Sequence, residues 1–218
     1  MELTKEQLSS VENYLLKKEV HFLDIKIEIF DHIASEIEFL IEEKGYKFEQ
    51  AFHITTMKWN KYFVQKSSIY LGSTYYAPKI VIQKAKRSFK THYLISITSY
   101  FILLIIFQNI EVQFSEKNIT SLSFIFRGVA IVSGLFFLFT YYKKFKSKVK
   151  TTYSFILKTQ TLNLLLFIIP ISNVSYFLEN GKINGIMIGL LGVLICTTIT
   201  TNYFYKKHLE IASKFEKL

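Results

Sequence analysis

The chain has 218 residues, of which 50% are hydrophobic and 20% are charged, and its mean hydropathy of +0.24 is high for a soluble protein. This mixture favours two unlike parts over one uniform fold, and the scarcity of Pro (2) and Gly (8) argues against a turn-rich β architecture. Residues 1–50 carry 12 acidic and 6 basic side chains whereas residues 51–92 carry 8 basic and no acidic ones, so the net charge of +10 is not that of a uniformly basic nucleic-acid-binding protein.

Residues 1–75 are predicted to form a cytosolic helical module. Thr4 and Gln7 match a capping box, which would open a first helix. Isoleucines at a spacing of four and three residues predict a second helix over residues 25–41, and Gly45 follows as its C-terminal stop. The module therefore begins with two amphipathic helices.

A third helix is predicted over residues 48–63, with Trp59 on its buried face. The segment "SSIYLGSTYYAP" (67–78) is expected to be a looser connection. Residues 76–92 are then predicted to form a basic amphipathic juxtamembrane helix that Pro78 opens. Its cations are expected to contact anionic lipid at the inner surface, at about 1 kcal/mol each; they are Lys79, Lys84, Lys86, Arg87 and Lys90.

The stretch "DIKIEIFDHIASEIE" (24–38) places several carboxylates and a histidine on the face of the second helix opposite its isoleucines. This surface is a candidate interaction site that comprises Asp24, Glu28, Asp31, His32 and Glu38. We favour a solvated acidic face. Docking of this face against basic residues 79–90 is one alternative. A metal site is another, formed by Glu28, His32 and either Glu36 or Asp31, but it needs ligands from a second helix, and the candidates His21 and His53 lack a matching acidic pattern.

Four apolar stretches follow, each comparable with the about 20 helical residues that a hydrocarbon core of about 30 Å requires. They cover approximately residues 93–110, 119–142, 153–178 and 183–205. Backbone groups in lipid must be hydrogen-bonded within the segment, so each stretch is predicted to be a helix. The fold class is therefore all-α, with a cytosolic module followed by a four-helix transmembrane bundle (93–205) and a short cytosolic tail (206–218).

Lysine-rich flanks predict the orientation of the bundle. They lie before the first span, between the second and third spans (143–150) and after the fourth span (206–207), whereas the other two loops carry one Lys each. Because cytoplasmic loops are enriched in Lys and Arg, both termini are predicted to lie in the cytoplasm of an inner-membrane, multi-pass protein.

A few residues in the spans raise a functional question. Arg127 and Lys158 are expected to extend to the nearer membrane surface, with a role in a pathway as the alternative, and Asn163 to contact another helix. The single Cys196 lies in an apolar run and is expected to be inert. A small-residue face for close helix packing, within the bundle or in a homodimer, is formed by Gly185, Gly189 and Gly192.

The N-terminal region also carries a resemblance. A short Thr-x-x-Gln helix, then "HFLDIKIEIFDHIASEIE" and "GYKFEQAF" ahead of membrane spans, resembles uncharacterised bacterial membrane proteins with a helical prefix module, similar to HAAS-type cytosolic domains. The resemblance covers about the first 65 residues. It implies a membrane-anchored signalling or interaction role and no catalytic residues.

The sequence contains no phosphate-binding Gly loop, no His-Glu-x-x-His motif, no paired cysteines and no Gly-x-Ser-x-Gly motif. We therefore predict a non-enzymatic protein without cofactor, whose partners are the lipid bilayer and a cytosolic protein. A small oligomeric transporter or channel that uses Arg127, Lys158 and Asn163 is the alternative. A membrane-bound metalloenzyme built on Asp31 and His32 is a third hypothesis.

Overall fold

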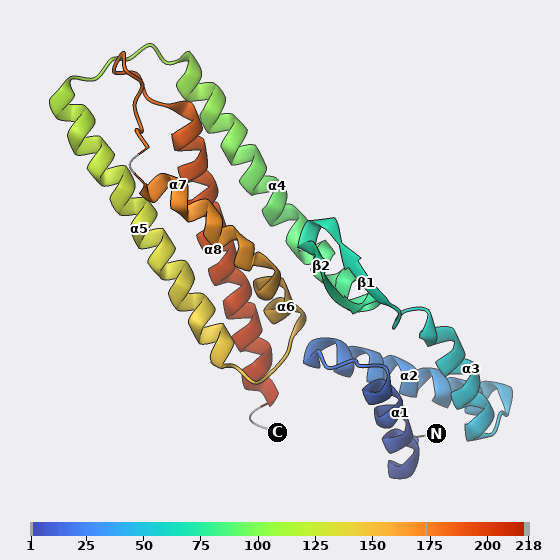
Figure 1. Cartoon of the computed structure of the whole chain (residues 1–218). Helices are drawn as coiled ribbons and strands as arrows, with labels where there is room; N and C mark the ends of the chain where they lie inside the picture. Colours follow the sequence, from blue (N-terminus) through green and yellow to red (C-terminus); the bar gives the residue numbers. More distant parts are fainter. Residues whose placement is uncertain (1, 173, 216–218) are drawn as a thin grey trace. The chain divides into compact units, whose positions relative to one another are not determined.

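The computed structural model describes residues 2–172 and 174–215 and is mainly α-helical (Figure 1). The first elements of this part of the chain are α1 (Lys5–Lys17), α2 (Leu23–Lys44), α3 (Phe48–Asn60), β1 (Gln65–Ser68), the 3₁₀ turn η1 (Ile69–Leu71) and β2 (Gly72–Pro78). The later ones are α4 (Lys79–Asn109), α5 (Glu116–Lys146), α6 (Thr152–Thr159), the 3₁₀ segment η2 (Gln160–Phe167), α7 (Ile168–Ile171) and α8 (Gly185–Phe215). The predicted all-α class is confirmed only as a mainly helical fold, because the chain also contains a small antiparallel sheet.

The chain divides into two compact units. The first contains the described residues of Met1–Arg87, Lys148–Phe155 and His208–Leu218, and the second contains Ser88–Ser147 and Ile156–Lys207. The predicted boundaries at 75/76 and 92/93 fall inside β2 and α4, so neither coincides with an end of an element. Residues 216–218 of the predicted tail lie outside the described part of the chain.

The helical start of the first unit follows the sequence signals. Thr4 and Gln7 form the expected capping box, in which the Gln7 backbone N–H donates to Thr4 Oγ1 (3.4 Å) and the Thr4 N–H donates to Gln7 Oε1 (2.8 Å). Gly45 ends α2 in the left-handed conformation (φ 67°), which glycine adopts without strain. Both predictions are confirmed.

The core of this unit lies between α1, α2 and α3. Four isoleucines of the predicted buried face of α2 are buried, namely Ile25, Ile29, Ile33 and Ile37, whereas Leu40 and Ile41 near its end are half-buried. Both α1 and α3 pack against α2. The Tyr14 hydroxyl of α1 donates to the Thr56 carbonyl oxygen of α3 (2.9 Å), and burial raises the pKa of Tyr14 to about 12. The three helices therefore form one packed module.

The connection expected over residues 67–78 is a β-hairpin, so the prediction of a looser segment is wrong. Strands β1 and β2 pair antiparallel from Gln65 opposite Pro78 to Ser68 opposite Gly72, with an irregularity between Lys66 and Ser68. Gly72 has φ 89°, a conformation that favours glycine. Helix α4 begins directly after Pro78, as predicted, and continues to Asn109. The predicted juxtamembrane helix and the first span are therefore parts of one helix.

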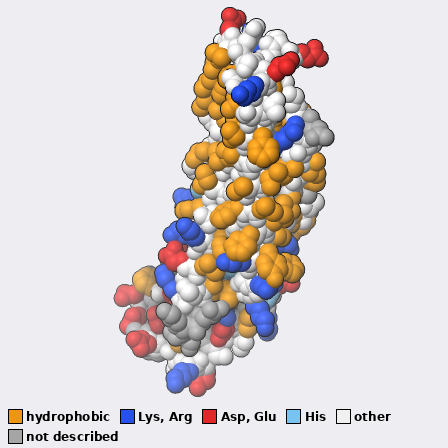
Figure 2. Space-filling view, turned by 90° about the vertical axis from the view of Figure 1, so that its left-hand side faces the viewer, with side chains coloured by type: hydrophobic (Ala, Val, Ile, Leu, Met, Phe, Trp, Pro, Cys, Tyr) orange, Lys and Arg blue, Asp and Glu red, His pale blue; other side chains and the backbone are white. Residues whose placement is uncertain are grey.

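Three helices are long and apolar enough to cross a membrane, namely α4, α5 and α8, and the pair of segments around α6 and α7 would make a fourth if it counts as one bent span. Each of the three long helices has 31 residues, or about 46 Å, more than the hydrocarbon thickness requires. Many of their large apolar side chains are exposed. Figure 2 shows hydrophobic side chains across the face on which α5 lies. These features are compatible with a multi-pass membrane protein.

The prediction of a continuous third helix over 153–178 is wrong. The chain there forms α6, η2 and α7, bends by 49° and leaves the helical conformation at Ser172 (ψ 176°). Pro170 cannot donate a backbone hydrogen bond to the preceding turn, which weakens the helix there. Beyond it, the buried Tyr176 hydroxyl donates to the Pro170 carbonyl oxygen (2.7 Å), and Phe177 forms a β-bridge with Ile183.

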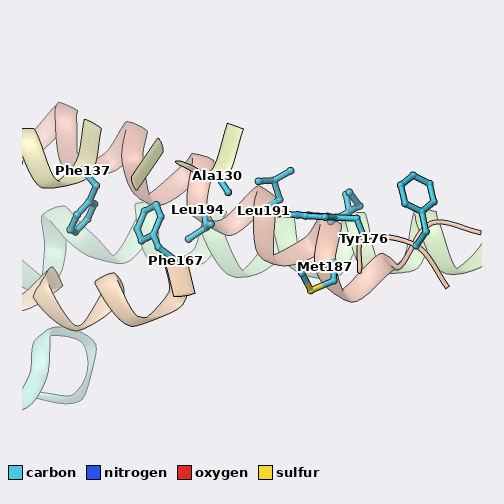
Figure 3. Packing of buried hydrophobic residues seen from close by; sticks show 9 residues of the cluster. Ala130, Phe137, Phe167, Tyr176, Met187, Leu191 and Leu194 are labelled. Carbon is cyan, nitrogen blue, oxygen red and sulfur yellow. The ribbon is translucent and has the colours of Figure 1, made fainter. Parts of the chain in front are cut away.

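The core of the second unit combines α5, η2, α8 and the segment that follows α7 (Figure 3). Its buried residues are Ala130, Phe137, Phe167, Tyr176, Phe177, Met187, Ile188, Leu191 and Leu194. Helix α8 also approaches α4 closely through the predicted glycine face. A Cβ added at Gly189 would lie 2.8 Å from the Tyr100 ring, and one added at Gly185 would lie 3.0 Å from the Leu104 carbonyl oxygen. This face is used within the chain, and a homodimer through it stays a prediction.

We expect Gly189→Val to destabilise the protein by about 1–3 kcal/mol, because the new side chain forces α4 away from α8. Gly128→Val is the matched control, since a Cβ at Gly128 of α5 meets nothing within 4 Å. Both substitutions raise the helix propensity in a similar way. Thermal unfolding of the full chain in detergent measures the difference. Equal melting temperatures for the two variants would contradict the close contact.

Candidate interaction site around Asp24

Asp24 lies in the first turn of α2 and holds a distant part of the chain. Its Oδ1 accepts a hydrogen bond from the Thr152 backbone N–H at 2.8 Å, across 128 residues of sequence. The Leu23 N–H donates to the Lys150 carbonyl oxygen, also at 2.8 Å. The Phe22 ring meets the Phe155 ring edge-on, with centroids 5.6 Å apart. The start of α2 is therefore fixed to Lys150, which precedes α6, and to the first turn of α6.

Lys84 of α4 supplies a positive charge next to Asp24. Its Nζ lies 2.8 Å from Glu28 Oε2 and 3.4 Å from Asp24 Oδ2. The Asp24 side chain is only 7% exposed, so its charge requires a partner. Lys84 precedes the apolar part of α4. Burial disfavours its charged form, but the hydrogen bond that Lys84 donates to Glu28 and the charges of both carboxylates outweigh burial and raise the pKa of Lys84.

The end of α8 joins the same unit through His208. His208 and Thr151 are both fully buried, and Thr151 Oγ1 lies 3.0 Å from His208 Nδ1. Thr151 also caps the following turn, because its Oγ1 accepts from the Ser154 N–H (3.1 Å) while Ser154 Oγ accepts from the Thr151 N–H (2.9 Å). We call this cluster the Asp24 junction; it comprises Asp24, Glu28, Lys84, Thr151, Thr152 and His208. These residues come from four separate segments of the chain.

Only part of the acidic surface predicted on the second helix belongs to the junction. Asp24 and Glu28 meet Lys84, which agrees with docking of the acidic face against basic residues 79–90. Asp31 is exposed, so a solvated face describes that position but not the buried Asp24 carboxylate.

The other two predicted residues have different neighbours. His32 stacks on Trp59, with ring centroids 6.4 Å apart. Glu38 Oε1 accepts from the Leu3 N–H at 3.1 Å. The predicted surface is therefore divided among several contacts around α2.

The described residues do not assemble a metal site. Between residues 2 and 215, with residue 173 left aside, no group of three or more His, Cys, Asp or Glu side chains is arranged to hold a metal ion. Glu36, one of the proposed ligands, instead pairs with Lys58 (2.6 Å) and accepts from the Trp59 indole N–H (3.1 Å).

The predicted lipid contacts of α4 have varied surroundings. Lys84 faces Asp24 and Glu28. Lys79 Nζ lies 6.0 Å from the Tyr62 ring centroid, and Lys86 Nζ lies 4.9 Å from that of Tyr70. Exposed side chains are found at Arg87 and Lys90.

The three intramembrane polar residues do not share one environment. Arg127 Nε is buried and has no hydrogen-bond partner among the described residues. Lys158 is exposed near the end of α6, and the Asn163 amide donates to Gln160 Oε1 at 2.7 Å.

Thr151, Thr152 and His208 were missed by the sequence reasoning. The spacing of Thr151 and Ser154 matches a local cap at a helix start, and this signal was available. His208 lies three residues past the predicted fourth span and belongs to no pattern. Comparison of the chain with models of known protein families, with curated proteins and with solved structures finds no match. The junction is therefore interpreted from its own geometry.

We expect Asp24→Ala to destabilise the protein by about 1–3 kcal/mol, because the buried Thr152 N–H loses its acceptor. Lys84→Met should also destabilise, and the double variant should show a coupling energy of about 0.5–3 kcal/mol. Thermal unfolding and trypsin resistance of the full chain measure both effects.

Asp31→Ala is the matched control on the same helix, with an expected change within about 0.5 kcal/mol. If Asp24→Ala behaved like Asp31→Ala, or if the Asp24 and Lys84 effects were additive, the junction would not be a coupled unit.

Proposed function

We propose that this chain is a non-enzymatic, multi-pass inner-membrane protein whose cytosolic helical head binds a protein partner. In this proposal α4, α5, the bent α6–α7 segment and α8 form a four-helix transmembrane bundle. Both termini lie in the cytoplasm. The head comprises α1 to α3 with the β-hairpin, and it serves interaction or signalling.

The proposal rests on which segments of the chain fold together in the first unit. This unit contains residues from the N-terminal segment, from the Lys-rich segment between α5 and α6, and from the end of α8. The Lys-rich flanks had predicted these three regions to lie on one side of the membrane. Three segments that share a compartment can fold together, whereas segments on opposite sides of a bilayer cannot. The compact unit thus supports the orientation independently of the Lys count.

Contacts between Lys and aromatic side chains at the end of α5 support a membrane boundary at that end. Lys143 Nζ lies 4.4 Å from the Phe139 ring centroid, and Lys146 Nζ lies 4.7 Å from that of Tyr142. Lysine and aromatic side chains of this kind typically lie at the boundary between lipid headgroups and hydrocarbon.

The Asp24 junction supports a signalling role for the head. Hydrogen bonds link the start of α2 to Thr152 at the start of α6, and Thr151 to the end of α8. An ion pair links α2 to Lys84 of α4. A partner that binds the head with different affinity for two arrangements of this junction would shift the population between them. The resemblance of the first 65 residues to HAAS-type prefix modules points to the same class of function.

The proposal is tested with two single-cysteine variants in a Cys196→Ala background, Asp31→Cys in the head and Glu179→Cys in the loop before α8. Both positions are exposed. A membrane-impermeant maleimide should label Glu179→Cys on intact cells and Asp31→Cys only after permeabilisation. A benzophenone maleimide at Asp31→Cys, activated in native membranes, should then give a discrete adduct with another protein.

Glu179→Cys with the same reagent is the matched control and should not give that adduct. Labelling of Asp31→Cys from outside would refute the orientation. Correct sidedness without an adduct specific to the head would refute the partner and leave the membrane layout standing.

A channel or transporter is the second candidate, and the interruption of the third span favours it. Backbone that leaves the helix at membrane depth is tolerated where it is buried in protein or lines a water-filled cavity. The buried Arg127 Nε, without a hydrogen-bond partner among the described residues, adds a cation to the same unit. Arg side chains in pores favour anions.

We expect chloride efflux from liposomes containing the purified chain to exceed that from empty liposomes if this second candidate is correct. Arg127→Ala should then lower the efflux several-fold, whereas Lys158→Ala removes a cation from an exposed position and should have a smaller effect. Efflux equal to that of empty liposomes, or unchanged in Arg127→Ala, would remove the anion-pore hypothesis.

A further inference from the structure

The tip of the β-hairpin presents one strongly exposed isoleucine. Ile69 is 93% exposed, whereas Leu71, two residues later in the same 3₁₀ turn, is only 1% exposed. Leu71 fixes the turn to the first unit, and Ile69 projects away from it. A single fully exposed aliphatic side chain on an ordered turn forgoes the stabilisation that removal from water would provide.

The hairpin runs along the first turns of α4. At its base, the Lys79 N–H donates to the Val64 carbonyl oxygen (2.9 Å). At its tip, the Tyr70 ring lies 4.9 Å from Lys86 Nζ. Lys86 is seven residues further along α4 than Lys79, or about 10 Å at the helical rise. The hairpin tip is therefore displaced from its base along the first turns of α4, from Lys79 toward Lys86.

That direction leads to the predicted membrane surface. Within α4, the apolar stretch begins at Tyr93, seven residues after Lys86 and again about 10 Å further along the helix. A Lys side chain can extend its ammonium group over several ångströms along an apolar surface. In the proposed membrane placement, Lys86 therefore lies one Lys side chain's reach or little more from the start of the apolar stretch, at the level of the lipid headgroups.

The charge around the tip is complementary to an anionic lipid surface. Residues 51–92 contain 8 basic and no acidic side chains. Arg87 and Lys90 on the same helix are exposed. Basic segments next to a membrane span are attracted to anionic headgroups, and neighbouring aromatic and aliphatic side chains enter the interface.

We propose that the tip of the β1–β2 hairpin, Ile69 with Tyr70, inserts into the headgroup region of the anionic inner leaflet beside α4. This inference rests on the proposed membrane placement and adds a second, peripheral contact between the head and the lipid. A protruding isoleucine needs no shaped pocket in a fluid lipid interface, whereas a protein partner would have to supply one. The occupant is therefore the lipid surface.

The test uses the full chain with Cys196→Ser, reconstituted in nanodiscs that contain phosphatidylcholine and phosphatidylglycerol. An environment-sensitive fluorophore is attached at Ile69→Cys. We expect a blue-shifted emission relative to the detergent-solubilised, lipid-free sample, and a loss of intensity when the lipids carry a doxyl quencher near the headgroup. Both effects should weaken when phosphatidylcholine replaces phosphatidylglycerol.

Two labelled positions separate the possible outcomes. Ile105→Cys in the apolar part of α4 is 59% exposed and should be quenched by deep doxyl lipids. Met57→Cys on α3, an apolar residue that is 61% exposed, should be quenched far less than Ile69→Cys.

If the Ile105 label is not quenched, the membrane placement itself fails. If it is quenched but the Ile69 label is no more quenched than the Met57 label, the hairpin insertion is refuted and the placement stands. A blue shift at Ile69→Cys without lipid quenching would show that protein covers the tip, and this also refutes the proposal.

Discussion

The first unit depends on the requirement that a buried carboxylate keep its hydrogen bonds and its countercharge. Asp24 is nearly inaccessible to solvent; its Oδ1 accepts a hydrogen bond from the Thr152 N–H, and its Oδ2 has the Lys84 ammonium as countercharge at 3.4 Å. An unpaired ion in such a position costs several kcal/mol, so the chain around residue 152 and the start of α4 must both approach α2 if the protein is to fold. One side chain thus couples segments that are 128 residues apart.

The core of the second unit follows a different constraint, because its apolar helices gain stability from close packing. One close approach is between α8 and α4, where Gly189 leaves room for the Tyr100 ring and backbone. Small residues permit such contacts, and a lipid environment would not supply a hydrophobic driving force between helices. Where the helical path is interrupted, the Tyr176 hydroxyl bonds to the Pro170 carbonyl oxygen. This bond meets the general demand that buried backbone groups be paired.

Features that depend on neighbouring residues could be predicted from the sequence. The capping box at Thr4, the isoleucine face of α2, the stop at Gly45 and the start of α4 after Pro78 each rest on local geometry. The β-hairpin was missed because "SSIYLGSTYYAP" lacks regular alternation, and its base depends on the contact between Val64 and Lys79.

Long-range features could not be predicted in the same way. The apolar residues after Pro170 were predicted to belong to the third span because of their hydropathy. Hydropathy cannot predict the hydrogen bond from the Tyr176 hydroxyl to the Pro170 carbonyl oxygen. The sequence placed Asp24, Glu28 and Lys84 among candidate residues and raised docking as an alternative. It gave no means to find Thr152 or His208, because their partners lie 128 and 57 residues away in the sequence.

The first turns of α4 connect the two candidate surfaces of the head. Lys84 and Lys86 are two residues apart, which turns their side chains by about 200° around the helix. Lys84 accordingly faces the carboxylates of α2, while Lys86 faces Tyr70 at the hairpin tip. A contact between the hairpin and a charged lipid surface would act on the same two helical turns that hold the Asp24 junction. If both proposals hold, membrane composition and the state of the junction are linked through α4.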